Sequence, residues 1–473
     1  MVVVYCRMMH DFECQKSRVE HMGADEEDMI SKLPDCILCQ ILSFLPTREA
    51  VATSILSTRW KPLWTSVPDV DFDDSLLYSS RVTFWHPAKV NCFLNFVERV
   101  LLLRDSSKIR RFRLSCRVCF CPTRVHSWIS AAINNNAEDL DLCLFVDEPF
   151  ILPHCVFDNK SLKELKLEMN CIIQLPSHIS FPCLRTLHLC LITFPDEIST
   201  QRLLCSCPVL QELVLLDCEW MHLNEITISI PALRTLIIDD QPFLGSRNDI
   251  YDCKINIVAK NLLLFKYCGA LSSNIWLCDA PSVVHASVNI SRLCKRGKLV
   301  APRAIQLLSE LRHTSFLSIS SSTIEAIYME DHLHHHLPDF QRLTDLELTM
   351  ELEGHAVSKL MKFLQCLPKL ESVCFCEGLK PQLRQNSDAK IRESVPHCFL
   401  PSLRTVTLQN CRGSEVEMRL LLIFLGYGSL LEKMNVVWSR SSSRDPNKET
   451  KFQDQLQALK GCMQCVLVFV NHQ

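Results

Sequence analysis

Apolar residues recur along most of the chain in one short pattern, apolar-x-x-apolar-x-apolar. The clearest copies start at Leu162, Leu184, Leu210 and Leu233, so that neighbouring copies begin 22–26 residues apart. Alternation of this kind is typical of a short strand whose every second side chain points inward. One copy cannot cover its own apolar side, but stacked copies form a continuous core. The pattern therefore predicts a solenoid of repeats.

Weaker copies of the pattern extend the repeat in both directions. They start at Ile109, Ala137, Leu262, Val283, Thr314, Leu343, Leu370, Leu403 and Leu431. A period of about 20–29 residues and the consensus L-x-x-L-x-L-x-x-N/C are typical of leucine-rich repeats. Asn170, Cys218 and Cys411 fit the last consensus position, whereas Ile192 and Gln241 do not. We therefore expect irregular repeats.

A helical pattern precedes the repeats. Pro34 suits the first position of a helix, and Pro46 cannot continue it. Thr47 is predicted to cap a second helix, and residues 59–64 to form a third. Three such short helices cannot bury all their apolar residues, so we expect the surplus to meet a partner or the next domain. The predicted buried face of the first helix contains Ile37, Leu38, Ile41, Leu42 and Leu45.

The two ends of the chain differ from the repeats. Residues 1–27 have no clear periodicity and are expected to form a flexible extension. Near the other end, residues 439–450 are predicted to be a polar loop, and Phe452, Leu456 and Leu459 to lie on a short helix. Residues 466–470 are predicted to form a buried strand. A terminal unit of a different type would cap the solenoid.

Composition excludes several classes of function. The chain has 473 residues with a net charge of −3, so it has no basic excess with which to bind nucleic acid. Glycine is scarce, at 10 residues, and neither a dinucleotide-binding nor a P-loop motif occurs. The nucleophile-elbow and zinc-protease motifs are also missing. We expect no cofactor and no enzymatic activity.

The 27 cysteines are expected to be reduced. The first residues lack the basic and apolar regions of a signal peptide, and no apolar run is long enough to cross a bilayer. We therefore expect an intracellular protein, in the cytoplasm, the nucleus or both, with no membrane contact. In that compartment most thiols stay unpaired.

Four groups of residues have spacings that resemble metal sites, but core or loop positions explain each group better. Cys36 and Cys39 lie mid-helix without a second pair. The Cys116, Cys119, Cys121 and His126 group consists mostly of a residue type that is commonly buried. Cys462 and Cys465 border the last strand, and His332, His334, His335 and His336 end in a Leu-Pro pair that is typical of a loop. We expect no metal site.

Residues 28–64 resemble a plant F-box. The match rests on Leu33-Pro34-Asp35, on residues 41–47, and on the elements Thr53-Ser54, Leu56-Ser57, Arg59-Trp60 and Leu63-Trp64. Residues 395–398, 400–418 and 431–434 resemble the FBD module. The order F-box, leucine-rich repeats, FBD is that of the plant F-box/LRR-repeat/FBD-domain proteins.

The resemblance implies an α/β fold with a short N-terminal three-helix F-box, an irregular leucine-rich-repeat solenoid shaped as a horseshoe, and a C-terminal FBD-type α/β cap. The expected divisions are a flexible extension (1–27), the F-box (28–75), the repeats (105–375) and an FBD-like module (393–473).

The resemblance also implies a function. The protein would be the substrate-recognition subunit of an SCF-type (Skp–cullin–F-box) ubiquitin ligase, and would reach cullin and a RING protein through a Skp-type adaptor. The open alternative for its adaptor residues is that several of them form the F-box's own core. The residues to which adaptor contact is carried over are Leu33, Pro34, Leu38, Ile41, Leu42, Leu56, Trp60 and Trp64.

A protein substrate would bind the concave sheet, which the alternate residues of the strands line. These residues start charged and become more apolar along the chain. Exposed apolar residues there would form a recognition patch, unless intervening loops cover them. The candidate substrate-binding residues are Lys166, His188, Val214, Leu216 and Ile237.

Two other functions compete with the ligase reading. A protein-interaction scaffold built on the repeats would leave the exposed apolar F-box helices without a purpose. A receptor for a phosphorylated small molecule would need clustered cations, and Lys166 is the one strong cation among the concave positions of the clearest copies.

Overall fold

A computed structural model describes residues 30, 32–77, 87–105, 107–117, 121–146, 150–240, 253–271, 273–278, 280–291, 297–329, 336–349, 352–353, 356–380, 401–428, 430–440, 446–460 and 465–470. The predicted N-terminal extension lies outside these residues. Contacts divide the chain into two units, residues 1–67 with 104–107, and residues 68–103 with 108–473.

The first unit contains the N-terminal helices, and we call its described residues up to Val67 the head. It consists of α2 (Asp35–Leu42), α3 (Thr47–Ala52), η1 (Thr53–Ile55), α4 (Trp60–Leu63) and η2 (Trp64–Ser66). The three predicted helices are confirmed. Proline precedes both α2 and α3, at positions 34 and 46, so Thr47 begins α3 and is not its capping residue.

Helix α2 is apolar on two sides, which corrects the predicted single buried face. Leu38 and Leu42 are 0% and 1% exposed, whereas Ile37 and Ile41 are 38% and 42% exposed. The four residues span too wide an arc of the helix for one small core to cover all of them.

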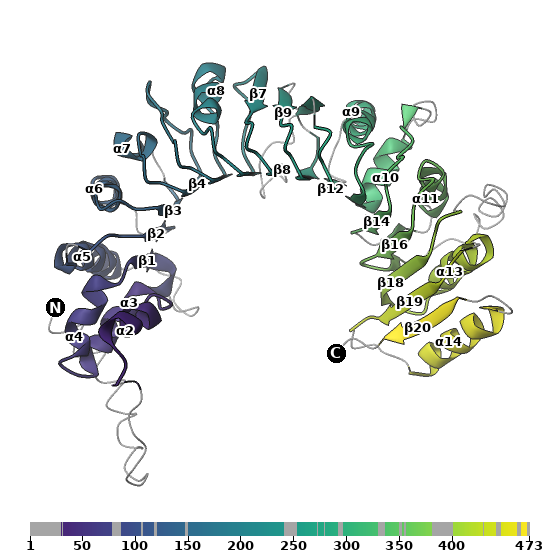
Figure 1. The fold of residues 1–473 in the computed structure, drawn as a ribbon, viewed down its shortest axis with the longest axis horizontal. Helices are drawn as coiled ribbons and strands as arrows, with labels where there is room; N and C mark the ends of the chain where they lie inside the picture. Colours follow the sequence, from purple (N-terminus) through teal and green to yellow (C-terminus); the bar gives the residue numbers. More distant parts are fainter. Residues whose placement is uncertain are drawn as a thin grey trace, which may run out of the picture. The chain divides into compact units, whose positions relative to one another are not determined.

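The second unit is built on one parallel sheet of fifteen strands. Within this unit the strands lie side by side along the inner side of a curve, and the helices lie on its outer side (Figure 1). Its strands in order are β1 (Asp69–Asp73), β2 (Arg111–Cys116), β3 (Asp139–Leu144), β4 (Glu164–Met169), β5 (Thr186–Cys190), β6 (Glu212–Leu216), β8 (Thr235–Asp240), β10 (Leu264–Gly269), β12 (His285–Ile290), β13 (Phe316–Ile319), β14 (Asp345–Leu348), β16 (Ser372–Phe375), β18 (Thr405–Cys411), β19 (Lys433–Trp438) and β20 (Val466–Val470).

Every predicted copy of the repeat is confirmed as a strand of this sheet. The strand begins two residues after the first apolar position in each case, as at Leu162, which precedes β4, and Leu431, which precedes β19. The two inward residues are fully covered: Leu165 and Leu167 are 1% and 2% exposed. The prediction missed β1, although Val67, Val70 and Phe72 follow the same pattern.

The outer layer is helical at both ends and contains strands in the middle. Its helices are α5 (Pro87–Leu103), α6 (Pro122–Asn134), α7 (His154–Phe157), α8 (Glu197–Cys205), α9 (Gly297–Glu310), α10 (Ser321–Ile327), α11 (Val357–Leu364), α13 (Glu415–Tyr427) and α14 (Pro446–Lys460). Between α8 and α9, three strands form a second parallel sheet: β7 (Glu225–Ser229), β9 (Lys254–Val258) and β11 (Asn274–Cys278). Consecutive β-branched residues, as in Ile226-Thr227-Ile228, favour strands over helices there. A two-stranded sheet joins β15 (Leu352–Glu353) and β17 (Leu379–Lys380).

The sheet continues from the repeats into the C-terminal region without a break, because β16 pairs in parallel with β18. Helix α13 begins at a capping box: Glu417 N donates to Ser414 Oγ at 3.3 Å, and Ser414 N donates to Glu417 Oε2 at 2.7 Å. Cys411, at the last repeat position, is 1% exposed.

Two predictions for the C-terminal end were wrong. Helix α14 starts at Pro446, inside the predicted polar loop of residues 439–450, because proline is well suited to the start of a helix. Strand β20 is not buried: Val466 and Val470 are 56% and 43% exposed. It lies at the end of the fifteen-stranded sheet, with β19 as its pairing strand there, so a second neighbour does not cover it.

Two partly buried acidic side chains lie where β6 and β8 end. Asp217 has a positive φ of 50°, and its Oδ1 is buried without a hydrogen-bond partner among the described residues. Burial, followed by the nearby charge of Asp239, raises the pKa of Asp217 to about 6. Burial also raises the pKa of Asp240 to about 7, although Tyr267 Oη donates to its Oδ2 at 3.2 Å and offsets part of the effect.

We predict that Asp217→Asn stabilises the protein at pH 8 and has little effect at pH 4. A raised carboxyl pKa means that the folded state binds the proton more tightly than the unfolded state, so stability is lost as pH rises from about 4 to about 6. Asparagine also tolerates the positive φ. After discounting for solvent screening, we expect a gain of about 1 kcal/mol at pH 8. Thermal unfolding at both pH values measures it. An equal effect at both values would contradict the assignment.

Candidate functional site

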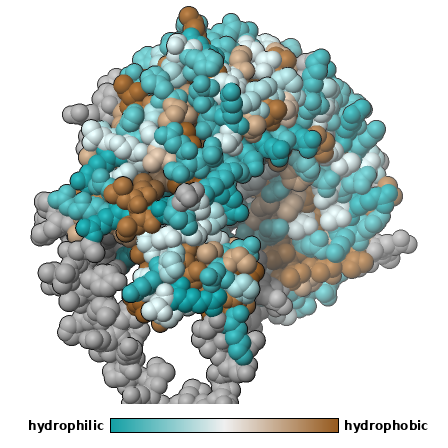
Figure 2. All heavy atoms as spheres, turned by 60° about the vertical axis from the view of Figure 1, so that its left-hand side comes forward, coloured by the Kyte–Doolittle hydropathy of each residue, from teal (hydrophilic) through white to brown (hydrophobic). Residues whose placement is uncertain are grey.

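The head exposes large apolar side chains although its own core is complete. The core consists of Leu38, Leu42, Ala50, Trp60, Leu63 and Val67, with Leu33, Cys39 and Trp64 packed against it. The exposed residues are Ile37 (38%), Ile41 (42%), Phe44 (86%), Leu45 (38%), Ile55 (45%) and Leu56 (63%). On the face drawn in Figure 2, brown apolar surface lies in patches among teal polar surface. We call these six residues the apolar patch of the head.

The predicted adaptor residues divide into two groups. Pro34, Ile41 and Leu56 are exposed, and Leu33 and Trp64 are half-buried. Leu38, Leu42 and Trp60 belong to the core, as the open alternative allowed for several of the eight residues. Sequence reasoning did not select Phe44. Phe44 could have been found from its spacing, because it lies three residues after Ile41 and seven after Ile37. Residues spaced in this way share one side of a helix.

An ion pair connects the first and last helices of the head. Arg59, just before α4, donates to Asp35 Oδ1 from Nε at 2.9 Å and from Nη2 at 2.6 Å. The same guanidinium also donates to the carbonyl of Leu33. An exposed pair of this kind contributes little stability by itself, but its several bonds fix the angle at which α2 starts. The position of the apolar patch depends on that angle.

The second candidate surface is the inner face, which we define as the side of the fifteen-stranded sheet that carries its partly exposed alternate residues. Parallel pairing aligns these residues in rows across the strands. One row runs through Asp71, Arg113, Asp141, Lys166, His188, Val214 and Ile237. Four of the five predicted substrate-binding residues therefore lie side by side. The fifth, Leu216, lies two positions further along β6.

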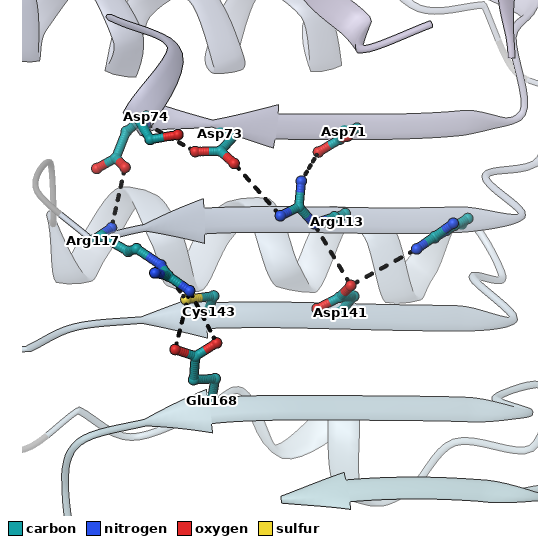
Figure 3. A network of polar contacts seen from close by, with 10 residues as sticks. Asp71, Asp73, Asp74, Arg113, Arg117, Asp141, Cys143 and Glu168 are labelled. Carbon is teal, nitrogen blue, oxygen red and sulfur yellow. Dashed lines mark hydrogen bonds and ion pairs between the residues drawn. The ribbon is translucent and has the colours of Figure 1, made fainter. Parts of the chain in front are cut away.

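The first strands of the inner face carry a dense network of charges (Figure 3). Arg113 Nη1 lies 3.0 Å from Asp71 Oδ1, its Nη2 lies 3.5 Å from Asp73 Oδ2, and its Nε lies 3.7 Å from Asp141 Oδ2. Burial lowers the pKa of Arg113, but the three carboxylates outweigh it, so the net change is upward. Burial raises the pKa of Asp141, partly offset by Arg113.

A second arginine, Arg117, extends this network to β3 and β4. Arg117 Nε donates to Cys143 Sγ at 3.1 Å, and its Nη2 lies 3.2 Å from Glu168 Oε1. Its backbone N–H donates to Asp74 Oδ1 at 3.2 Å. Burial raises the pKa of Cys143 to about 11 despite this arginine. The charges on β1–β4 are thus paired with one another, so a ligand would have to displace existing partners to use them.

The face becomes more apolar after the network. Lys166 still pairs with Glu164 at 2.5 Å, and His188 Nε2 lies 2.7 Å from Glu212 Oε1. Leu216 and Ile237 are partly exposed, whereas Val214 is 6% exposed. The apolar section of the inner face, which we define as Leu216 and Ile237, is therefore accessible and carries no ion pair of its own. Sequence reasoning missed Arg113 and Asp141 because their repeats are weak copies.

The structure describes only part of each of three candidate metal groups, and both residues of the Cys36–Cys39 group. Among the residues that the structure describes, no three His, Cys, Asp or Glu side chains are grouped so as to hold a metal ion. Cys39 Sγ contacts the carbonyl of Leu63 at 3.5 Å, Cys116 is buried, and Cys36 and His126 are exposed. Cys119, Cys462 and His332, His334 and His335 lie outside the described residues. Cys465, which is buried, and His336, which is exposed, are described. No helix in the described part of the chain is long and apolar enough to span a membrane.

Three family models match the chain. The F-box domain matches residues 30–70, the LRR repeats of the FBD-associated F-box protein At5g56370 match residues 125–245, and FBD matches residues 391–436. The first match covers the head, and the second covers β3–β8, including the apolar section of the inner face. F-box proteins generally bind Skp-type adaptors and act as substrate receptors of SCF ligases, and the F-box/LRR proteins are typically non-catalytic.

Arabidopsis thaliana proteins are similar to this chain over most of its length. F-box/LRR-repeat protein At4g14096 is 26% identical over 94% of this chain and 95% of its own. F-box protein At3g59000 is 30% identical over 86% of each chain. F-box/LRR-repeat protein At4g14103 is 31% identical over 74% of this chain and 92% of its own.

The helical head, the stacked repeat strands and these matches agree in order and in position along the sequence. The chain therefore belongs to the plant F-box/LRR-repeat family, with F-box, leucine-rich-repeat and FBD regions in that order.

Proposed function

We propose that this chain is the substrate-recognition subunit of an SCF-type ubiquitin ligase. The head docks a Skp-type adaptor, which connects it to cullin and a RING protein, and the inner face binds a protein substrate. The observation that carries the proposal is the apolar patch of the head: side chains as exposed as Phe44 (86%) and Leu56 (63%) lie outside a finished core. Solvent exposure of such a patch is costly, and burial against a partner removes that cost.

The eight predicted adaptor residues act in two ways in this proposal. Ile41 and Leu56, together with Phe44, supply the apolar contact, and Pro34 lies beside it at the start of α2. Leu38, Leu42 and Trp60 stabilise the head as part of its core, and the half-buried Leu33 and Trp64 pack against that core. Substitutions of the second group would therefore weaken adaptor binding by unfolding the head.

The substrate-binding residues remain a proposal that the row on the inner face supports. Leu216 and Ile237 offer apolar contact, and Lys166 and His188 border it with groups already held by Glu164 and Glu212. Val214 contributes mainly by packing, because it is 6% exposed. An apolar centre with a polar rim is the usual arrangement of a protein interface.

No catalytic group is required for this role. The receptor holds the substrate near the site of ubiquitin transfer, and proximity raises the rate. The proposal therefore makes the chain non-catalytic, and it places the protein inside the cell, in the cytoplasm, the nucleus or both. The alternative is a protein-interaction scaffold that uses the inner face without a ligase.

We predict that Ile41→Asp and Phe44→Asp each weaken binding of a Skp-type adaptor at least tenfold, about 1.4 kcal/mol. Each change places a charge where the interface would exclude water, and central apolar contacts often contribute more than this. Titration of the purified full-length chain with several plant Skp-type adaptors by calorimetry measures the effect.

The matched control is Ile198→Asp on α8, whose side chain is 73% exposed in the second unit. It should bind the adaptor like the wild type. Amide hydrogen exchange of residues 35–66 shows whether the head of each variant is folded. Failure of folded wild-type protein to bind any adaptor would remove the ligase proposal and favour the scaffold.

We predict that Leu216→Asp combined with Ile237→Asp abolishes substrate ubiquitination but leaves adaptor binding intact. Both changes place charges in the apolar section of the inner face, remote from the head in sequence. The measurement compares ubiquitinated proteins in plant cells that express wild-type protein, this variant, Phe44→Asp or Ile198→Asp. Ubiquitinated proteins whose presence depends on the wild-type chain should be lost with the Leu216/Ile237 variant and with Phe44→Asp. They should remain with Ile198→Asp. Their persistence in the Leu216/Ile237 variant would place substrate contact elsewhere.

A further inference from the structure

Two cysteine sulfurs are in contact on the inner face, remote in sequence from the apolar patch of the head and from the apolar section of the inner face. Cys374 lies on β16, and Cys376 follows the strand; their Sγ atoms are 3.8 Å apart. Phe375 between them is 1% exposed and points to the opposite side. Strand alternation therefore places both thiols on the same, partly exposed side of the sheet.

The surrounding backbone holds this pair in place. Cys376 N–H donates to the carbonyl of Leu348 at 2.9 Å, and Asn410 Nδ2 donates to the carbonyl of Cys376 at 2.7 Å. Glu347 is the direct cross-strand neighbour of Cys374, and Cys376 Sγ donates to Glu347 Oε1 at 3.1 Å. The contact between the sulfurs thus follows from the register of β14, β16 and β18.

The two thiols ionise as a pair. The hydrogen bond between the two sulfurs lowers the pKa of Cys374, while the same interaction, followed by burial and the bond to Glu347, raises the pKa of Cys376. The first thiolate therefore forms on Cys374. A thiolate is the nucleophile of cysteine chemistry, and a second thiol in contact can resolve its oxidised form.

We propose that Cys374 and Cys376 form a reversible redox pair that hydroperoxides oxidise to an intramolecular disulfide. The Cys374 thiolate attacks one peroxide oxygen, the O–O bond breaks, and hydroxide leaves, giving a sulfenic acid. Cys376 then attacks that sulfur, the S–S bond forms, and water leaves. With hydrogen peroxide, the sum is two thiols and one peroxide giving one disulfide and two waters.

The disulfide should be easily reduced. Extended backbone holds same-side residues i and i+2 about 6.6 Å apart at both Cα and Cβ, whereas a disulfide needs Cβ atoms about 3.5–4.5 Å apart. The bond therefore requires the backbone to bend at Cys376, which lies just after the end of β16, and it is strained. Strained or exposed disulfides are the labile, regulatory ones. Oxidation also removes the S–H that Cys376 donates to Glu347, so it changes the polar groups that the inner face presents between β14 and β16.

The other cysteines in the described part of the chain do not combine contacting sulfurs with a lowered thiol pKa. Cys205 and Cys207 have the same spacing, but they lie at the end of α8, where side chains two residues apart diverge. Cys207 is 1% exposed and its Sγ donates to the carbonyl of Leu203 at 3.5 Å. On the inner face, burial raises the pKa of Cys190 to about 11, which disfavours its thiolate. Cys205 and Cys207 are therefore a matched control.

Peptide mass spectrometry tests the proposal on the full-length chain. Trypsin does not cut between Lys380 and Pro381, so residues 370–384 form one peptide whose two cysteines are the proposed pair. Reduced protein is titrated with hydrogen peroxide, alkylated and digested. We expect this peptide to lose the mass of two hydrogens at low peroxide and to regain it with dithiothreitol. The peptide of residues 203–234 contains the control pair and Cys218, and all three of its cysteines should remain alkylated.

A variant separates the two chemical steps. With Cys376→Ser, Cys374 should be trapped as a sulfenic acid by dimedone, and no internal disulfide should form. The proposal is overturned if peptide 370–384 stays dithiol while the control peptide oxidises, or if both oxidise equally fast. It is also overturned if wild-type peptide 370–384 passes directly to sulfinic acid.

Discussion

The structure depends on the burial of two inward apolar side chains per strand between neighbouring strands. Leu165 and Leu167 of β4 are covered only because β3 and β5 place Leu140, Leu142, Leu187 and Leu189 beside them in register. Burying each such side chain contributes about 2 kcal/mol, and no single repeat can achieve this alone. Because every strand needs a neighbour, one sheet continues from β1 to β20 through regions that match three different family models.

This constraint also creates the surfaces. Because alternation commits one side of every strand to the core, the other side is left for recognition, and register aligns it in rows across the sheet. The rows place paired charges such as Arg113 and Asp141 first, the apolar Leu216 and Ile237 next, and the Cys374–Cys376 pair further on. The head differs from the sheet. Six buried residues form its core, and the six residues of its apolar patch are exposed.

Sequence reasoning located the strands well because the spacing of inward residues is local. Thirteen named starts, from Ile109 to Leu431, each precede a strand by two residues. It failed where the answer depends on neighbours. Ile37 and Leu38 are both apolar, and only the packing of α2 against α4 decides which is buried. The exposure of β20 depends on its place at the end of the sheet, and the contacts of Arg113 depend on cross-strand register.

The proposed adaptor interface is the apolar patch of the head. Hydrogen–deuterium exchange of the full-length chain, alone and saturated with a Skp-type adaptor, distinguishes this surface from the inner face. We expect slower exchange in residues 37–45 and 53–57 on adaptor binding, with the strands of the inner face unchanged. Slower exchange in the inner-face strands with an unchanged head would rule out the head as the interface.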